Sequence, residues 1–284
     1  MIAEDVKWIH VELSSKCNAW CPACPRNTNG YGLSPWLIEQ DLSIERYIEI
    51  LNLLPNLEVV QLCGNLGDPI IATNILDAIA YAINRKLKVQ IHTNGSLRSV
   101  TWWESLGALL KDHPHDVWFG LDGFSSVHEI YRQGTDYNKI IANATAFINA
   151  GGFATWQFIP FEHNEHQVKD CIRISQQLGF KKFKLVKLYR NIKTSRHYKT
   201  GKEFDLLPPK EFQSIVHMPW KSKEVKVSDC MHVAQPSVYL SASGALSWCC
   251  YHTHITPFDS LNELFSTTLD LTHPHCVKNC GSII

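Results

Sequence analysis

Three cysteines lie close together near the start of this sequence, in the stretch Cys17-Asn18-Ala19-Trp20-Cys21-Pro22-Ala23-Cys24. The strand-like run 8–13 precedes them, so they should lie on the loop that follows the first strand. Three thiolates on one short loop can bind three corners of a cube-shaped iron–sulfur cluster, because such clusters take soft sulfur ligands. The fourth iron would then have no protein ligand, and an open coordination position lets a metal bind and activate a small molecule.

The composition is that of an ordinary folded protein. With 284 residues, 45% apolar and 19% charged, the chain fits one large domain or one domain with a small appendage. No apolar run approaches the ~18 residues of a membrane span, and the acidic N-terminus lacks the apolar segment of a secretory signal. We therefore expect a cytoplasmic protein with no membrane partner.

The ten cysteines are clustered, which favours metal binding over a disulfide framework in a chain without a secretory signal. Those near the two ends are Cys17, Cys21, Cys24, Cys230, Cys249, Cys250, Cys276 and Cys280. Only Cys63 and Cys171 lie between them, and both are most simply interpreted as buried small hydrophobic residues.

The formal net charge is zero, but residues 181–202 hold nine Lys or Arg and no Asp or Glu. One interpretation of this segment is a solvated basic loop. The other is a patch that receives an anionic substrate, such as a nucleotide, a sugar phosphate or an acidic peptide.

Strand-like and helix-like segments alternate through most of the chain. The expected strands are 7–14, 57–63, 87–92, 116–121, 153–160 and 182–189, and the expected helices are 43–54, 74–86, 100–111, 137–150 and 165–178. Ser43 or Asp41 should cap one helix, and Gly151 and Gly179 should end two others. This alternation implies right-handed βαβ units and a parallel sheet, so we predict an α/β fold, a partial (β/α)6 TIM-like barrel. Chemistry in such barrels gathers at the C-terminal ends of the strands, where the cysteine loop falls.

The pattern changes in the last third of the chain. We predict a partial barrel over 1–203, a linker over 204–224 and a small C-terminal module over 225–284. Residues 236–249 are typical of a β-hairpin that turns at Ser243-Gly244. The module should therefore consist of a small β-hairpin and a helix.

The cysteine loop and three later motifs together resemble the radical S-adenosylmethionine (SAM) enzymes. Cys17, Cys21 and Cys24 match the signature of that family. The later motifs follow in order at strand ends: Gly64-Asn65-Leu66-Gly67-Asp68-Pro69, His92-Thr93-Asn94-Gly95-Ser96, and Leu121-Asp122-Gly123 followed by Tyr131-Arg132-Gln133-Gly134. They are similar to the family's Gly-Gly-Glu-Pro, Thr-Asn-Gly and Asp-Gly…Arg-x-Gly motifs. The resemblance implies a [4Fe–4S] cluster on the three cysteines, and SAM bound to the open iron and cleaved by one electron to a 5′-deoxyadenosyl radical.

The resemblance also implies roles for residues around SAM. Asp68 and the backbone of Gly67 would accept the methionyl ammonium, Asn94 would bond the ribose, and Arg132 would pair with the carboxylate. Each has a plainer alternative: a turn before proline for Asp68, an Asn-Gly turn for Asn94, and a surface salt bridge for Arg132. Ala23 stands where the family often has an aromatic residue on the adenine, so Trp20 is the candidate for that contact, with ordinary packing as its alternative.

The C-terminal cysteines resemble the twitch fold, a shortened SPASM domain that holds an auxiliary cluster. The candidate ligands are Cys230, Cys249, Cys276 and Cys280, which suffice for one auxiliary [4Fe–4S] cluster. A structural zinc ion on the same four thiolates is the alternative. Cys250 could replace Cys249 as a ligand, and Cys63 and Cys250 are candidate catalytic thiols that could give a hydrogen atom to a substrate radical.

The resulting hypothesis is a radical SAM enzyme that oxidises a small polar or anionic substrate with the help of one auxiliary cluster. An electron donor such as flavodoxin or ferredoxin is implied by the resemblance. Maturation of a peptide, by epimerisation or crosslinking, is a second hypothesis, although no N-terminal peptide-recognition domain is evident. Nucleotide or nucleic-acid modification is favoured only by the segment 181–202, and a zinc-stabilised binding module is the non-enzymatic alternative.

Overall fold

A computed structural model describes residues 1–112, 114–186, 194–212, 224–225, 236–250, 257–267 and 282–283. Three of the predicted ligands, Cys230, Cys276 and Cys280, lie outside these residues. In the parts that are described, no helix combines the length and the apolar character needed to cross a membrane.

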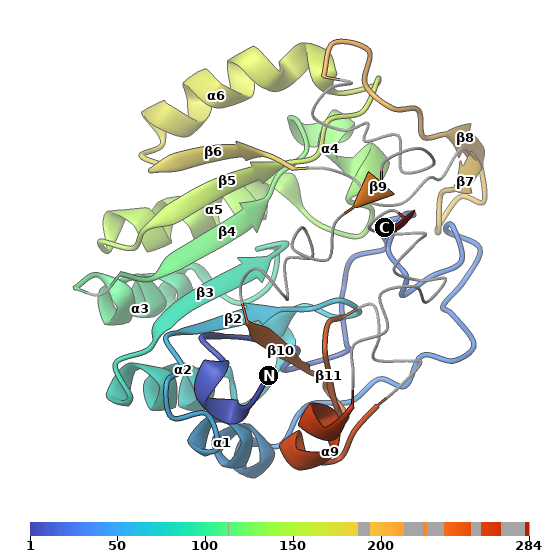
Figure 1. The fold of residues 1–284 in the computed structure, drawn as a ribbon. Helices are drawn as coiled ribbons and strands as arrows, with labels where there is room; N and C mark the ends of the chain where they lie inside the picture. Colours follow the sequence, from blue (N-terminus) through green and yellow to red (C-terminus); the bar gives the residue numbers. More distant parts are fainter. Residues whose placement is uncertain are drawn as a thin grey trace. The chain divides into compact units, whose positions relative to one another are not determined.

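The central feature is a sheet of eight strands in the order β11-β10-β1-β2-β3-β4-β5-β6 (Figure 1). Its strands are β1 (Trp8–Val11), β2 (Val59–Cys63), β3 (Lys88–Thr93), β4 (Asp116–Gly120), β5 (Ala154–Phe158), β6 (Lys182–Leu185), β10 (Ser237–Leu240) and β11 (Leu246–Ser247). The pairs β10–β1, β1–β2, β4–β5 and β5–β6 are parallel, and β10–β11 is antiparallel. The predicted parallel α/β sheet and the predicted C-terminal hairpin are thereby confirmed.

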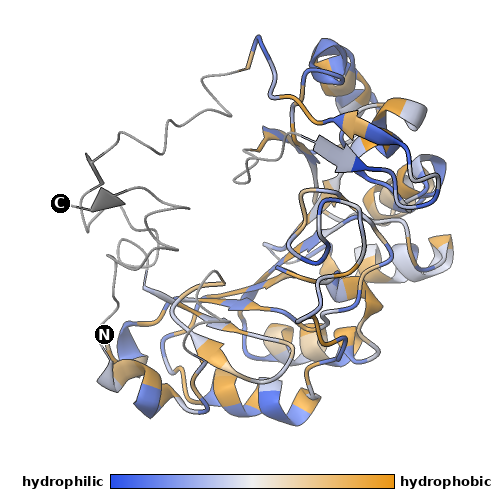
Figure 2. Cartoon of the chain, turned by 90° about the vertical axis from the view of Figure 1, so that its right-hand side faces the viewer, coloured by the Kyte–Doolittle hydropathy of each residue, from blue (hydrophilic) through white to orange (hydrophobic). Residues whose placement is uncertain are grey.

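Helices alternate with the strands as predicted. They are α1 (Ile44–Asn52), α2 (Ile75–Asn84), α3 (Val100–Leu110), α4 (Ser125–Tyr131), α5 (Tyr137–Asn149), α6 (Val168–Gln177) and α9 (Leu261–Ser266). Short 3-10 helices cover Ala3–Asp5, Pro69–Ile71 and Glu165–Gln167, and two-stranded sheets pair β7 (Thr194–Arg196) with β8 (Glu203–Asp205) and β9 (Glu224–Val225) with β12 (Ser282–Ile283). The helices in Figure 2 are striped blue and orange, as expected for helices with one buried and one solvated face.

Local signals explain where these helices begin and end. The Ser43 hydroxyl accepts a hydrogen bond from the Arg46 amide at the start of α1, as predicted. Gly151 and Gly179 follow α5 and α6 with φ of 98° and 86°, a left-handed conformation that favours glycine. The helix predicted over 165–178 begins as a 3-10 turn and becomes α-helical only at Val168.

The chain folds into two compact units. The first comprises Met1–Lys16, Glu39–Gln90 and Pro219–Ile284, and the second comprises Cys17–Ile38 and Ile91–Met218. The hairpin β10–β11 belongs to the first unit, because β10 pairs with β1. The division predicted at residues 203 and 224 stays a prediction.

The two faces of the first unit's strands differ in chemistry. Ile9 and Val11 on β1, and Val60 and Leu62 on β2, are fully buried and form the core with α1 and α2. Side chains alternate between the two faces of a strand, so His10, Glu12, Gln61 and Cys63 share the opposite face. On these two strands, the polar and sulfur-bearing side chains named here thus lie on the face opposite the apolar core.

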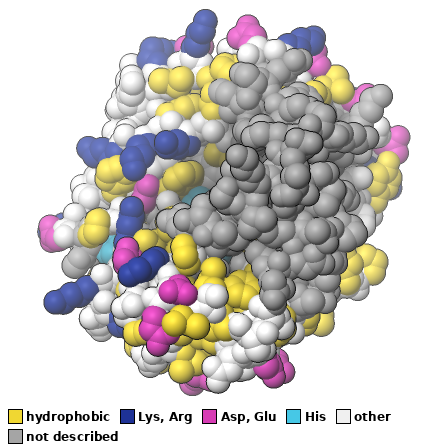
Figure 3. Space-filling view, in the orientation of Figure 1, with side chains coloured by type: hydrophobic (Ala, Val, Ile, Leu, Met, Phe, Trp, Pro, Cys, Tyr) yellow, Lys and Arg dark blue, Asp and Glu magenta, His cyan; other side chains and the backbone are white. Residues whose placement is uncertain are grey.

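The surface mixes charges of both signs. On the face shown in Figure 3, Lys and Arg side chains are interspersed with Asp and Glu. Within the basic segment 181–202, Lys182 lies 3.8 Å from Asp116 and over the Phe153 ring, and Arg196 lies over the Tyr31 ring. These described basic side chains thus have partners within the protein.

Candidate functional site

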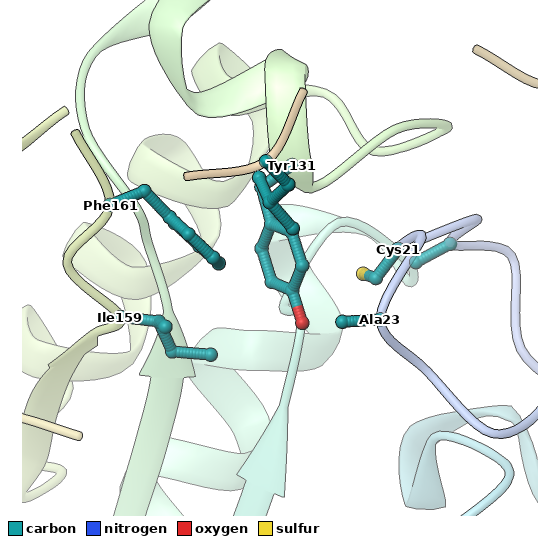
Figure 4. Close-up of a cluster of buried hydrophobic side chains, with 7 residues drawn as sticks. Cys21, Ala23, Tyr131, Ile159 and Phe161 are labelled. Carbon is teal, nitrogen blue, oxygen red and sulfur yellow. The ribbon is translucent and has the colours of Figure 1, made fainter. Parts of the chain in front are cut away.

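The cysteine loop of the second unit packs into a small apolar cluster. Cys21 is 8% exposed, and its sulfur lies in a cluster with Ala23, Tyr131, Ile159 and Phe161. Cys17 and Cys24 are partly buried against the same cluster. Figure 4 shows the Tyr131 ring between Cys21 and Ala23 on one side and Ile159 and Phe161 on the other. The loop thus places all three thiols against one apolar wall.

Asn94, at the end of β3, contacts this loop. Its amide nitrogen lies 3.7 Å from the Cys17 sulfur and donates to the Asn18 side-chain oxygen at 2.9 Å. Its oxygen accepts from both the backbone amide and the hydroxyl of Ser96, at 2.9 Å each. The Asn-Gly turn expected as the alternative is also present, since Gly95 has φ of 71°. Asn94 therefore serves the turn and supplies an N–H donor to a predicted cluster ligand.

Arg132 forms a buried ion pair at the same loop. Its Nε donates to Asp122 at 2.6 Å, and the Asp122 side chain is fully buried. The salt bridge expected as the alternative is therefore present, but it is buried rather than on the surface, because α4 folds the motif back onto the end of β4. Gly120 makes room for this, since a Cβ there would lie 2.9 Å from Arg132 Cζ.

The guanidinium of Arg132 also affects the cysteine loop. Burial raises the pKa of the Cys21 thiol to about 12, and the charge and hydrogen bond of Arg132 oppose that rise. A cation beside a buried thiol favours the thiolate, which is the form that binds metal. Arg132 is thus placed to support Cys21 as a ligand, and contact with the carboxylate of SAM stays a prediction.

His128, which the sequence analysis did not single out, holds the end of β4. It is fully buried, and its Nδ1 accepts from the backbone amide of Asp122 at 3.1 Å. Its Nε2 lies 3.0 Å from the Thr135 hydroxyl. A backbone N–H can only donate, so Nδ1 is unprotonated and the neutral ring carries its proton on Nε2. Burial, and then the charge of Arg132, lower the pKa of His128 to about 3.

Trp20 packs on an aromatic ring of the protein itself. Its ring stacks on Tyr198 with centroids 5.2 Å apart and planes 6° apart. Its backbone amide donates to Gln133 O at 2.7 Å, and the Gln133 side chain accepts from the Tyr198 amide at 3.0 Å. The packing role is therefore present, and adenine contact by Trp20 stays a prediction.

In the first unit, the loop 64–68 is fixed by close backbone contacts. A Cβ on Gly67 would lie 1.9 Å from Ser14 O, and one on Gly64 would lie 1.8 Å from Gly67 O. The Asp68 amide donates to Lys16 O at 2.9 Å. Asp68 is 3% exposed, and its carboxylate accepts from the Ile70 amide at 3.2 Å, which caps the 3-10 helix Pro69–Ile71. The expected turn role is thus present, and ammonium binding stays a prediction.

A buried carboxylate, missed from the sequence, holds the same loop. Glu12 is 1% exposed and accepts from the amides of Leu66, at 2.5 Å, and Gly67, at 2.9 Å. Its second oxygen accepts from the Tyr239 hydroxyl at 2.6 Å. The sequence does show an acidic residue inside the strand-like run 8–13. A carboxylate buried in a strand is expected to have a specific hydrogen-bond partner, so Glu12 could have been identified from this position.

The two candidate catalytic thiols, Cys63 and Cys250, both lie in the first unit. Burial raises the pKa of Cys63 to about 12, and the charges of Glu12 and Asp68 add to the rise. The Cys250 carbonyl accepts from the Asn65 side chain at 3.1 Å. Cys63 is thus a protonated thiol near neutral pH, and a hydrogen-atom role for either thiol stays a prediction.

The predicted auxiliary site is represented by Cys249 alone among the described residues. Cys249 is 8% exposed, and its carbonyl accepts from the Ser247 hydroxyl at 2.9 Å. Its three predicted fellow ligands lie outside the described residues, so the ligand set stays a prediction.

The thiols of Cys17, Cys21 and Cys24 suit a cubane cluster by their chemistry. Within the described parts of the chain, no three His, Cys, Asp or Glu side chains meet as they would around a single metal ion. In a cubane each thiolate binds a separate iron, so the sulfurs need not meet at one point. The Cys17 thiol also has an N–H donor in Asn94, and the charge of Arg132 favours the Cys21 thiolate, so both groups support the form that binds metal.

Neither a protein-family model nor a curated protein matches the sequence. Solved structures do match the fold. SuiB of Streptococcus suis bound to S-adenosylmethionine aligns with a TM-score of 0.65 at 12% identity, over 96% of this chain and 67% of SuiB. Native anSMEcpe with bound AdoMet aligns with a TM-score of 0.60 at 14% identity, over 92% of this chain and 81% of that chain. SuiB bound to its precursor peptide SuiA gives a TM-score of 0.62 at 13% identity, over 96% of this chain and 66% of SuiB. This chain thus spans about two thirds of SuiB, and its α/β fold is that of SuiB and anSMEcpe, two proteins whose structures hold S-adenosylmethionine.

Proposed function

We propose that this protein is a radical SAM enzyme of the oxidoreductase type. The observation that carries the proposal is the meeting of three motifs in the second unit. The Asn94 amide nitrogen lies 3.7 Å from the Cys17 sulfur, and the charge of Arg132, held by Asp122, favours the Cys21 thiolate. A cysteine loop met by the ends of β3 and β4 is the arrangement expected from the family motifs. The folds of SuiB and anSMEcpe support the proposal, since both structures hold SAM.

Each residue then has a definite task. Cys17, Cys21 and Cys24 would hold a [4Fe–4S] cluster that leaves one iron for SAM. When bound and reduced, the cluster and SAM supply a 5′-deoxyadenosyl radical that abstracts a substrate hydrogen. Arg132 stabilises the Cys21 thiolate, and Asn94 orients Cys17 while offering polar atoms to the ribose. Gly67 and Asp68 present backbone and carboxylate acceptors to the methionyl ammonium, and Trp20 is the candidate for the adenine.

The C-terminal cysteines would hold one auxiliary [4Fe–4S] cluster in a twitch-like module. Cys230, Cys249, Cys276 and Cys280 supply four thiolates, which is the ligand count of such a cluster. An auxiliary cluster could accept the electron left on a substrate radical, which suits a dehydrogenase-like oxidation. Flavodoxin or ferredoxin would supply the electron that starts the reaction, and such a system would operate in the cytoplasm.

Two observations favour two different substrate classes. The basic segment 181–202 favours a small polar or anionic molecule. A peptide substrate is the second candidate, and the specific observation for it is the fold. The matched structures include SuiB bound to the precursor peptide SuiA and anSMEcpe bound to the Kp18Cys peptide, the latter with a TM-score of 0.59.

Alanine substitution of the loop cysteines tests the proposal. The single variants Cys17→Ala, Cys21→Ala and Cys24→Ala should each lose formation of 5′-deoxyadenosine from SAM and dithionite, because a three-thiolate loop with one ligand removed no longer holds the cluster. Cys171→Ala is the matched control, since Cys171 is a fully buried cysteine on α6. It should keep the wild-type yield. If a loop variant still forms 5′-deoxyadenosine at the wild-type rate, the assignment is wrong.

A further inference from the structure

Strands β1, β2 and β10 bring a group of polar side chains to one face of the first unit. In the register of these parallel strands, His10 lies opposite Tyr239 on one side and Gln61 on the other. The rings of His10 and Tyr239 meet edge to face with centroids 4.8 Å apart, and His10 Nε2 hydrogen-bonds the Cys63 carbonyl at 2.5 Å. Glu12, two residues after His10, continues the same face. The C-terminal hairpin thus contributes Tyr239 to this polar face.

Glu12 connects the hairpin to the loop 64–68. One carboxylate oxygen receives the amides of Leu66 and Gly67, and the other receives the Tyr239 hydroxyl. Glu12 and Tyr239 are each 1% exposed, so these three donors replace the water that the carboxylate loses. Burial raises the pKa of Glu12, whereas the Tyr239 hydroxyl and then the loop amides favour its ionised form. Removing the Tyr239 hydroxyl should therefore weaken the hydrogen bonds that Glu12 accepts from the Leu66 and Gly67 amides.

A second contact joins the same two segments. The Asn65 side chain donates to the Cys250 carbonyl at 3.1 Å, next to the predicted ligand Cys249. The loop itself has little room to adjust, because the backbone at Gly67 packs directly on Ser14 O. The hairpin segment 237–250 is therefore linked to the loop twice, through Tyr239 by way of Glu12 and through Cys250 directly.

We propose that Tyr239 and Glu12 are positioning residues that hold the loop 64–68 in its SAM-binding form, so that SAM affinity depends on the C-terminal hairpin. The inference rests on the proposed function, since it takes Gly67 and Asp68 as the acceptors of the methionyl ammonium. Through Glu12, the hairpin fixes the two consecutive peptide planes that carry the Leu66 and Gly67 amides, and these planes directly precede the Gly67 carbonyl and Asp68. A substitution in the hairpin would then change the affinity for SAM without any direct contact between the hairpin and SAM.

Two measurements on the full-length, reconstituted protein test this. Hydrogen–deuterium exchange reports the protection of the Leu66 and Gly67 amides, and anaerobic equilibrium dialysis with SAM reports its Kd. Tyr239→Phe removes only the hydroxyl. It should speed exchange in a peptide covering 64–68 and raise the Kd for SAM about tenfold, since a hydrogen bond to a charged group contributes on that scale. Tyr47→Phe is the matched control, because Tyr47 is also fully buried and its hydroxyl donates to Ala78 O at 3.1 Å.

A pair of substitutions at Glu12 separates positioning from general loss of structure. Glu12→Gln keeps an oxygen for the two loop amides, whereas Glu12→Ala removes it. Exchange at 64–68 and the Kd for SAM should therefore lie closer to wild type in Glu12→Gln than in Glu12→Ala. Exchange in α1 and α2 serves as the internal measure of folding and should be equal in the wild type, Tyr239→Phe and both Glu12 variants.

The outcomes distinguish the two ideas. If Tyr239→Phe and Tyr47→Phe show the same exchange at 64–68 and the same Kd, the positioning inference is overturned while the proposed function stands. If the wild-type protein binds no SAM but Tyr239→Phe still loosens the loop, the proposed function fails and the positioning of the loop by the hairpin is upheld.

Discussion

At the scale of single residues, His128 decides how the end of β4 is held. Its unprotonated Nδ1 accepts the Asp122 amide, and Asp122 in turn holds Arg132 beside the Cys21 thiol. A protonated ring could not accept that bond, so acid should release Asp122 from its position. Burial and the nearby Arg132 keep the pKa of His128 at about 3, well below the ordinary value of 6.5.

This depressed pKa predicts a loss of stability in acid. The unfolded chain binds a proton at His128 below pH 6.5 while the folded chain binds none until about pH 3, so stability falls as the pH drops through this window. Between pH 7.5 and pH 5 the loss from this residue is about 2 kcal/mol. His128→Gln, which can accept and donate but does not titrate, should lose correspondingly less over the same interval. Urea unfolding followed by tryptophan fluorescence at the two pH values measures both, and equal losses in the two proteins would refute the account of His128.

Individual residues were the hardest to predict from the sequence. The Asp122, Arg132 and Asn94 motifs could be found because they match a family pattern at strand ends. Glu12, His128 and Tyr239 belong to no such motif. Glu12 and Tyr239 are partners across 227 residues, and His128 meets the Asp122 amide, six residues earlier, only once α4 has folded against the end of β4. The role of a buried carboxylate or imidazole can be recognised only when the fold shows which hydrogen-bonding groups surround it.

At the scale of elements, the loop 64–68 depends on two glycines more than on its side chains. Gly67 does not need a left-handed conformation, but it packs so closely on Ser14 O that a Cβ would have no room. The same loop carries the amides held by Glu12 and the predicted ammonium acceptors. Its shape is therefore set by backbone contact.

Gly67→Ala should displace this loop. Because the Cβ would lie 1.9 Å from a backbone oxygen, the chain must shift, and overpacking of this kind destabilises proteins by about 1–3 kcal/mol. The Kd for SAM should rise by more than about tenfold, since the acceptors move with the loop. Gly179→Ala is the control, because it places a side chain at φ of 86° after α6 and should lower the melting temperature without changing the Kd. Wild-type SAM affinity in Gly67→Ala would show that the loop does not bind SAM.

Longer elements were predicted well and short ones poorly. Helices such as α1 and α5 have capping residues and apolar periodicity, so their position was evident to within a few residues. The seven-residue α4 and the pair β7–β8 were missed, since they have too few residues for a periodic pattern. Buried contacts of His128 and Tyr131 stabilise α4, and such contacts are not visible in local sequence.

At the scale of the whole molecule, the alternation of strands and helices predicted the α/β class, but the place of β10 could not be predicted. It pairs in parallel with β1, on the side opposite β2, after more than two hundred intervening residues. Local pattern gives the hairpin and its turn at Gly244, whereas the choice of neighbour depends on long-range packing. The pairing of β10 with β1 joins the hairpin to the strand that precedes the cysteine loop.

Cys17, Cys21 and Cys24 should hold a cluster with one iron open to SAM. Electron paramagnetic resonance of the anaerobically reconstituted, dithionite-reduced protein, with and without SAM, tests it most directly, with iron and zinc analysis of the same samples. The wild type should contain about eight irons per chain. Its reduced [4Fe–4S] signal should shift on addition of SAM. The shift should vanish when the three loop cysteines are replaced by alanine and persist in Cys230→Ala and Cys276→Ala, which should each lose about four irons. Zinc bound by the loop, or a reduced signal that SAM leaves unchanged, would contradict the account.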